Sequence, residues 1–119
     1  MAQFDILLQG GKVYDPRPGK IEEQDVAVKD GVIAARGKNL PADAATVMDV
    51  TDCIVSPGLI DMHCHIFPMF PYPYHDSLRT TNAEEHMPRC GVTTAVDAGT
   101  TGWRNFGDFK EHVIDATKV

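Results

Sequence analysis

The stretch that decides the fold is Pro57-Gly58-Leu59-Ile60-Asp61-Met62-His63-Cys64-His65. Its apolar start, entered through a proline and a glycine, predicts a strand over 59–66. Side chains two positions apart share one face of a strand, so we expect Asp61, His63 and His65 on the same face. Two imidazoles that lie about 6–7 Å apart along a strand can converge on a single metal ion. The spacing therefore indicates a metal site at this strand.

The residues around the two histidines sharpen this interpretation. Neutral imidazole suits zinc, iron, manganese or nickel, and the carboxylate of Asp61 is expected to orient a ring nitrogen. Cys64 is expected to face away from the histidines and to pack as a small core residue. A His-x-His pair also arises by chance, so how strongly it supports a metal site depends on the rest of the chain.

The residues before this stretch predict a small antiparallel β module over 1–55. Gly10-Gly11 is expected to form a hairpin turn, 15–19 a loop, and Asp30-Gly31 a tight turn. The expected strands lie at 4–8, 12–14, 25–29, 32–36, 47–50 and 53–55.

From residue 56 onward the pattern alternates between strand and helix, which is typical of a parallel sheet with covering helices. A helix is expected over 82–89 and a strand over 92–96. A second helix is expected to begin at Asn105, with Asp108 completing a capping box. Its predicted core face consists of Phe106, Phe109, Val113 and Ala116.

Composition excludes several function classes. The 119 residues include 11 basic and 17 acidic side chains, for a net charge of −6, and no basic stripe, so we expect no nucleic-acid or membrane partner. The chain start lacks a signal-peptide pattern, and no apolar run approaches the roughly 20 residues of a membrane span. An odd set of cysteines, with no CxxC spacing, indicates reduced thiols in a cytoplasmic protein. These cysteines are Cys53, Cys64 and Cys90.

Together these segments resemble one known family over essentially all of the chain. The nine-residue stretch resembles the Pro-Gly-Leu-Ile-Asp-x-His-x-His signature that opens the catalytic barrel of the amidohydrolase superfamily. The similarity is greatest to its dihydroorotase, hydantoinase and deacetylase branches. The β module resembles the N-terminal part of that family's small β-sandwich, including a turn like Asp30-Gly31. Residues 91–102 resemble the second barrel strand and its loop, most closely in a bacterial amidohydrolase/deacetylase subgroup.

The resemblance implies an α/β fold in two parts. Residues 1–55 would form part of a β-sandwich, and residues 56–119 the first two or so βα units of a metal-dependent hydrolase (β/α)8 TIM barrel. His63 and His65 match the first-strand ligands of the more buried metal. The implied cofactor is a divalent metal, zinc above all, as one or two ions that activate water against an amide.

The family's remaining catalytic groups come from later barrel strands. These groups are a bridging lysine, two further histidines and a general-base aspartate, and a complete barrel has ~250 residues. Two histidines are also one ligand short of a usual catalytic zinc site. We therefore expect this chain by itself to be inactive, whether as an N-terminal fragment, a truncated product or one half of a split enzyme.

The leading functional hypothesis is a hydrolase of amide C–N bonds that is deacetylase-like and acts on a small molecule, as a homo-oligomer when complete. The alternatives are a dihydroorotase- or hydantoinase-type enzyme that opens a cyclic amide, a deaminase of the same superfamily, and a non-catalytic interaction module. The residues that would choose among these activities lie in later loops of the family's barrel.

Three further residues are candidates for substrate contact, and each has a simpler alternative. His75 would border the mouth of the site or be a solvated loop residue, and Asp97 would face the site or cap the loop that follows it. Arg104 would hold a substrate carboxylate or be an ordinary surface arginine. His86 and His112 are expected at the surface.

Overall fold

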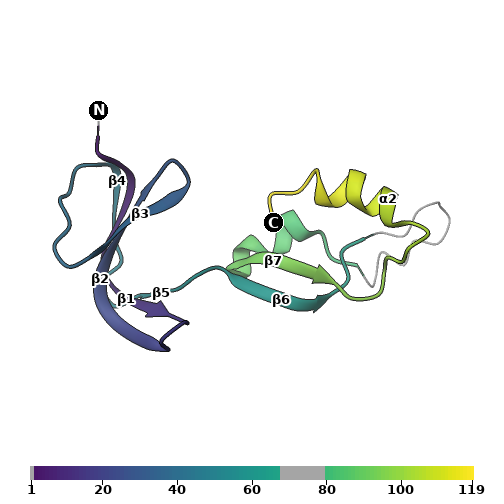
Figure 1. Ribbon diagram of the computed structural model, residues 1–119, viewed down its shortest axis with the longest axis horizontal. Helices are drawn as coiled ribbons and strands as arrows, with labels where there is room; N and C mark the ends of the chain where they lie inside the picture. Colours follow the sequence, from purple (N-terminus) through teal and green to yellow (C-terminus); the bar gives the residue numbers. More distant parts are fainter. Residues whose placement is uncertain (1, 68–79) are drawn as a thin grey trace. The chain divides into compact units, whose positions relative to one another are not determined.

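The computed structural model describes residues 2–67 and 80–119, which divide into two compact units, Met1–Pro57 and Gly58–Val119 (Figure 1). Each unit has its own sheet, and each holds its own cluster of buried apolar side chains. Within the described ranges, no helix has the length and apolar character needed to cross a membrane.

The first unit is a five-stranded mixed sheet. Its strands are β1 (Phe4–Asp15), β2 (Lys20–Lys29), β3 (Val32–Gly37), β4 (Ala44–Asp49) and β5 (Ile54–Val55). The order is β3-β2-β1-β4, with β5 also paired to β1. The predicted antiparallel pairing holds for β1, β2 and β3 but is wrong for β4 and β5, which run parallel to β1. After β3 the chain crosses to the far side of β1, and a crossover of this kind yields parallel pairs.

The predicted hairpin turn at Gly10-Gly11 is wrong, because β1 continues straight through it. Leu8 pairs with Val26 and Gly11 with Gln24, so the two residues between Leu8 and Gly11 form a bulge opposite Asp25. Gly10 has a φ of 79°, and its N–H donates to Asp25 Oδ1 at 2.9 Å. A glycine pair fits a bulge as well as a turn, and here the long-range bond to Asp25 selects the bulge.

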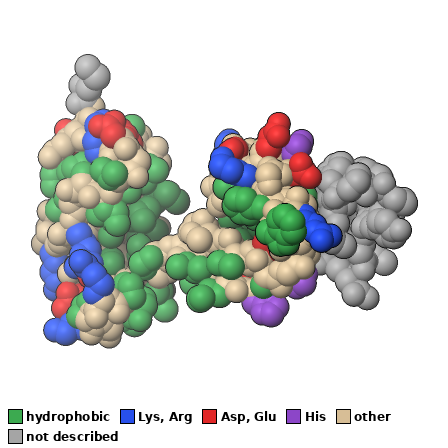
Figure 2. Space-filling view, turned by 45° about the vertical axis from the view of Figure 1, so that its right-hand side comes forward, with side chains coloured by type: hydrophobic (Ala, Val, Ile, Leu, Met, Phe, Trp, Pro, Cys, Tyr) green, Lys and Arg blue, Asp and Glu red, His purple; other side chains and the backbone are tan. Residues whose placement is uncertain are grey.

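The predicted tight turn at Asp30-Gly31 is confirmed, with φ values of 51° and 76° at its two residues. The sheet it helps to form buries few side chains completely. Phe4, Leu7 and Ala27 make up the buried cluster. Large apolar side chains remain exposed elsewhere, among them Ile33 at 69%, and Figure 2 shows apolar groups over much of this unit.

The second unit is a parallel β-α-β arrangement, as predicted. Strands β6 (Leu59–Cys64) and β7 (Val92–Asp97) pair in parallel, with Ile60 opposite Thr94. Between them lie α1 (Ala83–His86) and a 3-10 turn, η1 (Pro88–Cys90), which ends at Gly91 with a φ of 75°. After β7 come α2 (Phe106–Phe109) and a π-helical turn, η2 (Lys110–Ile114).

Both helices differ from their predicted form. Asn82 caps α1 by accepting from the amides of Glu84 and Glu85 at 3.0 and 3.3 Å, but the helix ends early. Pro88, which has no N–H to continue an α-helix, starts the 3-10 turn instead. The predicted capping box at Asn105 is wrong, because its Oδ1 accepts from the amide of Gly102 at 2.8 Å in the preceding loop.

These helices pack on one side of the two strands. Phe67 is fully buried, and its ring meets that of Phe109 edge to face with centroids 5.3 Å apart. Phe106 was predicted as core but stays 49% exposed, since among the described rings it packs only on Phe109. Ala116, predicted on the same face, is also exposed. The remaining buried members of this cluster are Ile66, Ala83 and Met87, with Cys64, Val92, Ala95 and Val113 packed against it.

Candidate metal centre

The strand that carries the histidines lies unusually close to its neighbour at its beginning. A Cβ atom added to Gly58 would lie 1.9 Å from Oγ1 of Thr93 on β7, a distance that no side chain tolerates. Glycine before β6 therefore lets the two parallel strands approach each other. β6 ends at Cys64, and the carboxyl ends of barrel strands are where such folds place their sites.

His63 lies in β6, and His65 follows one residue beyond the strand's end. Their ring centroids are 6.0 Å apart and the ring planes differ by 29°. Two imidazoles bound to one tetrahedral zinc through bonds of ~2.1 Å have ring centres roughly 5 Å apart. The observed separation is close to that value, and imidazole nitrogens suit zinc and related divalent metals.

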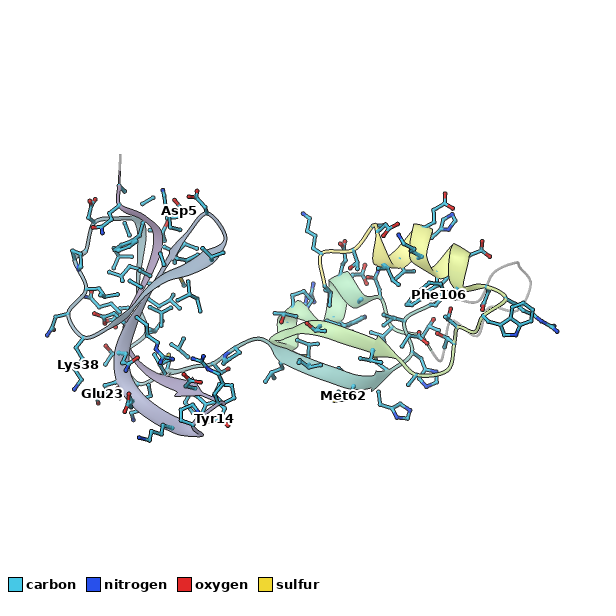
Figure 3. All side chains as sticks on the ribbon, viewed as in Figure 1. Asp5, Tyr14, Glu23, Lys38, Met62 and Phe106 are labelled. Atoms are coloured by element: carbon cyan, nitrogen blue, oxygen red, sulfur yellow. The ribbon has the colours of Figure 1, made fainter. Side chains whose placement is uncertain are left out.

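Asp61 supports this pair through the backbone. Its Oδ1 accepts from the amide of His63 at 3.0 Å, and no bond to either imidazole ring is found among the described residues. The pairing register with β7 shifts between Asp61 and Cys64, so strict alternation breaks there. Met62, expected on the face opposite the histidines, is 75% exposed and lies on the side of β6 away from α2 (Figure 3).

Cys64 packs against the apolar cluster, as expected, and its thiol lies 3.3 Å from the carbonyl oxygen of Val96. Burial raises the pKa of this thiol, and the negative charges of Asp61 and Asp97 add to the effect. Because its side chain packs against this cluster, Cys64 has the core role that the sequence predicted.

Asp97, at the end of β7, faces the backbone of both neighbouring loops. Its Oδ2 accepts from the amides of Ile66 and Phe67 at 2.9 and 3.1 Å and from the Thr100 hydroxyl. Its Oδ1 accepts from the amides of Gly99 and Thr100 at 3.3 and 2.9 Å. Burial by itself raises the pKa of this carboxyl, but the bonds from Thr100, Ile66 and Phe67 outweigh burial and lower it. This is the loop-capping alternative that the sequence left open.

The other candidates are Arg104, His75, His86 and His112. Arg104 stacks on Trp103, with its guanidinium carbon 5.2 Å from the ring centroid, and Trp103 is 86% exposed. His75 lies outside the described residues. His86 and His112 are exposed, as expected, and His112 Nδ1 lies 3.0 Å from the carbonyl of Asp108. Within 2–67 and 80–119, no group of three or more His, Cys, Asp or Glu side chains could hold a metal.

Comparison with known proteins shows what this chain is similar to. No family model matches the sequence. The chain is 49% identical over 61 residues to the dihydroorotase of Pelotomaculum thermopropionicum, which is 51% of this chain and 14% of that protein. A solved dihydroorotase structure matches 94% of this chain and 28% of its own, with 32% identity and a TM-score of 0.75. The chain matches the N-terminal portion of enzymes of the amidohydrolase superfamily.

Two solved D-aminoacylase structures agree with this match. One is described as defining a subset of the amidohydrolases and the other by its binuclear metal centre. Each is 32% identical to this chain with a TM-score of 0.59, and they cover 80% and 79% of it and 18% of their own chains. The predicted fold class, part of a small β-sandwich followed by the start of an α/β barrel, is confirmed. The chain spans about a seventh of its first curated relative, at 14%.

Proposed function

We propose that this chain supplies the first metal-binding segment of a metal-dependent hydrolase that cleaves an amide C–N bond in a small molecule. The observation that carries the proposal is the placement of His63 and His65 at the end of β6, with ring centroids 6.0 Å apart. A catalytic zinc site uses three protein ligands. Because the described residues offer no third side chain here, the remaining ligands are expected from residues outside them.

Several residues of this chain would have separate roles at the metal centre. His63 and His65 would hold the ion, zinc by preference and as one of one or two ions, while Asp61 fixes the backbone of His63. A bound divalent metal lowers the pKa of its water toward ~7 and polarises the amide carbonyl. Arg104, held against Trp103 in the loop after β7, is a candidate for pairing with a substrate carboxylate. His75 remains a candidate for substrate contact.

Two substrate classes fit this centre. The similarity to D-aminoacylase supports a linear N-acyl compound, the deacetylase-like hypothesis, and the similarity to dihydroorotase supports a cyclic amide. Hydrolysis assays of the full-length protein with an N-acyl amino acid and with a six-membered cyclic amide distinguish them. Activity on neither amide would argue against both classes.

Removing both histidines tests the metal site directly. In the full-length protein, we expect the His63→Ala/His65→Ala variant to lose at least one equivalent of metal per chain by elemental analysis and to lose amide hydrolysis. The matched control, His86→Ala/His112→Ala, removes two exposed histidines of the same unit and should retain both. Full metal content in the first variant would overturn the ligand assignment.

A further inference from the structure

The segment that carries His65 lies outside regular strand pairing, yet its backbone is held on several sides. The carbonyl of Cys64 accepts from the amide of Ala98 at 2.8 Å, and the carbonyl of His65 accepts from the amide of Thr81 at 2.7 Å. The next two amides, of Ile66 and Phe67, both donate to Asp97 Oδ2. The peptide groups on either side of the His65 imidazole are therefore fixed from other parts of the unit.

Asp97 is itself held by the loop that follows β7. The Thr100 hydroxyl donates to Oδ2, and the amides of Gly99 and Thr100 donate to Oδ1. The amide of Phe67 also lies 3.3 Å from Thr100 Oγ1, so Thr100 contacts both partners of the bond. The loop also lies near the ring, since a Cβ added to Gly99 would be 3.9 Å from Cε1 of His65.

We propose that Asp97, held by Thr100, is a positioning residue of the metal centre: it orients the turn after His65 so that this imidazole faces His63, and it contacts neither metal nor substrate. This inference rests on the proposed function. An ionised carboxylate has about four lone-pair sites, and five donors within the described residues already use them. Asp97 therefore has no lone pair left for a metal ion.

A comparison of the two histidines shows why His65 needs a positioning residue. His63 lies within β6, where its amide donates to Asp61 Oδ1 and the next residue, Cys64, pairs with Asp97 of β7. Among the described residues His65 has no strand partner, and we expect the ring separation of 6.0 Å to depend on the turn that follows it. Groups that orient metal ligands are commonly worth 10- to 100-fold in metal affinity.

The test uses the full-length protein with Co²⁺, whose visible spectrum reports the geometry around the ion. Asp97→Asn replaces one acceptor oxygen with an NH₂ group that faces other donors. We expect it to weaken Co²⁺ binding by about 10- to 100-fold and to change the spectrum. Asp108→Asn makes the same chemical change at an exposed position of α2 and should leave both unchanged.

A second pair of variants separates positioning from folding. Thr100→Ser keeps the hydroxyl that donates to Asp97 and should keep wild-type affinity and spectrum, whereas Thr100→Val loses the hydroxyl and should weaken binding. Circular dichroism and thermal unfolding of each metal-free variant show whether the fold is retained. If Asp97→Asn does not fold, the Thr100 pair decides the question.

The outcomes separate this inference from the function on which it rests. A folded Asp97→Asn variant with wild-type Co²⁺ affinity and spectrum would overturn the positioning role alone, provided the double-histidine variant loses metal. Equal Co²⁺ binding by Thr100→Val and Thr100→Ser would count against it in the same way. Metal retained by the double-histidine variant would overturn the proposed ligands, and the positioning role would fall with them.

Discussion

In each unit an aspartate accepts from the backbone amides of two separate segments, but the joined segments differ in kind. Asp25 is 5% exposed and accepts from the amides of Gly10 and Leu40, both at 2.9 Å, tying the bulge of β1 to the loop after β3. Asp97 ties the turn after His65 to the loop after β7. The same chemistry thus stabilises a sheet in one unit and a candidate ligand in the other. Changes in the first unit should alter stability alone, and changes in the second should also alter metal binding.

The largest expected loss of stability comes from Asp25→Ala. Two amides lose a buried charged acceptor, so the free energy of unfolding should fall by about 3 kcal/mol. Urea denaturation of the 119-residue chain measures this loss, and Asp43→Ala, which removes an exposed carboxylate of the same unit, should cost little. In the folded full-length protein, Co²⁺ affinity should not change. A drop in affinity there would show that the two units do not act separately.

A smaller loss, about 2 kcal/mol, is expected from Gly58→Ala, because the new methyl group overlaps the Thr93 side chain. Unlike Asp25→Ala, it should also weaken Co²⁺ binding, since it displaces the strand that carries His63. In a Thr93→Gly background the same change should be nearly neutral, which a double-mutant cycle measures. Gly107→Ala is the control, because nothing lies within 4 Å of its added Cβ. If Gly58→Ala lowered the free energy of unfolding equally in both backgrounds, overlap with the Thr93 side chain would not be the cause.

The parts of the fold that sequence predicted are those with local causes. The parallel pair β6 and β7 follows from strand patterns separated by a capped helix, and the Asp30-Gly31 turn from two residues that tolerate positive φ. The bulge at Gly10 was missed because the partner that selects it, Asp25, is 15 residues away. The parallel direction of β4 was missed because crossover connections, which carry no local signature, determine it.

The candidate site shows the same division. Two-residue spacing predicted that His63 and His65 are neighbours, and their ring centroids lie 6.0 Å apart although His65 follows the end of the strand. The spacing of Asp97 and Thr100 suggested a capped loop, since short polar side chains bond amides two or three positions on. Nothing in the sequence near Asp97 shows its bond to Ile66, which spans 31 residues and forms only when the two strands pair.

The smallest of the three expected effects is a loss of stability at low pH, and it arises from a carboxyl group in the first unit. Hydrogen bonds from the side chains of Arg17 and then Arg36, at 3.1 and 2.8 Å to Oδ2, hold the pKa of the Asp15 carboxyl well below its usual range. A carboxyl with a pKa lower in the folded than in the unfolded state stabilises the fold above its unfolded pKa of about 3.9. That stabilisation is lost as the pH falls toward the lower, folded pKa.

The stabilising effect should be modest, because the Arg17 side chain is 84% exposed and water screens such a pair. We expect the thermal midpoint of the wild type to exceed that of Asp15→Asn above about pH 5, and the difference to shrink progressively below about pH 4. Melting curves of the 119-residue chain between pH 2 and 7 measure it, with Asp43→Asn as the exposed control. A difference that stayed constant down to pH 2 would mean that Asp15 acts through packing rather than charge.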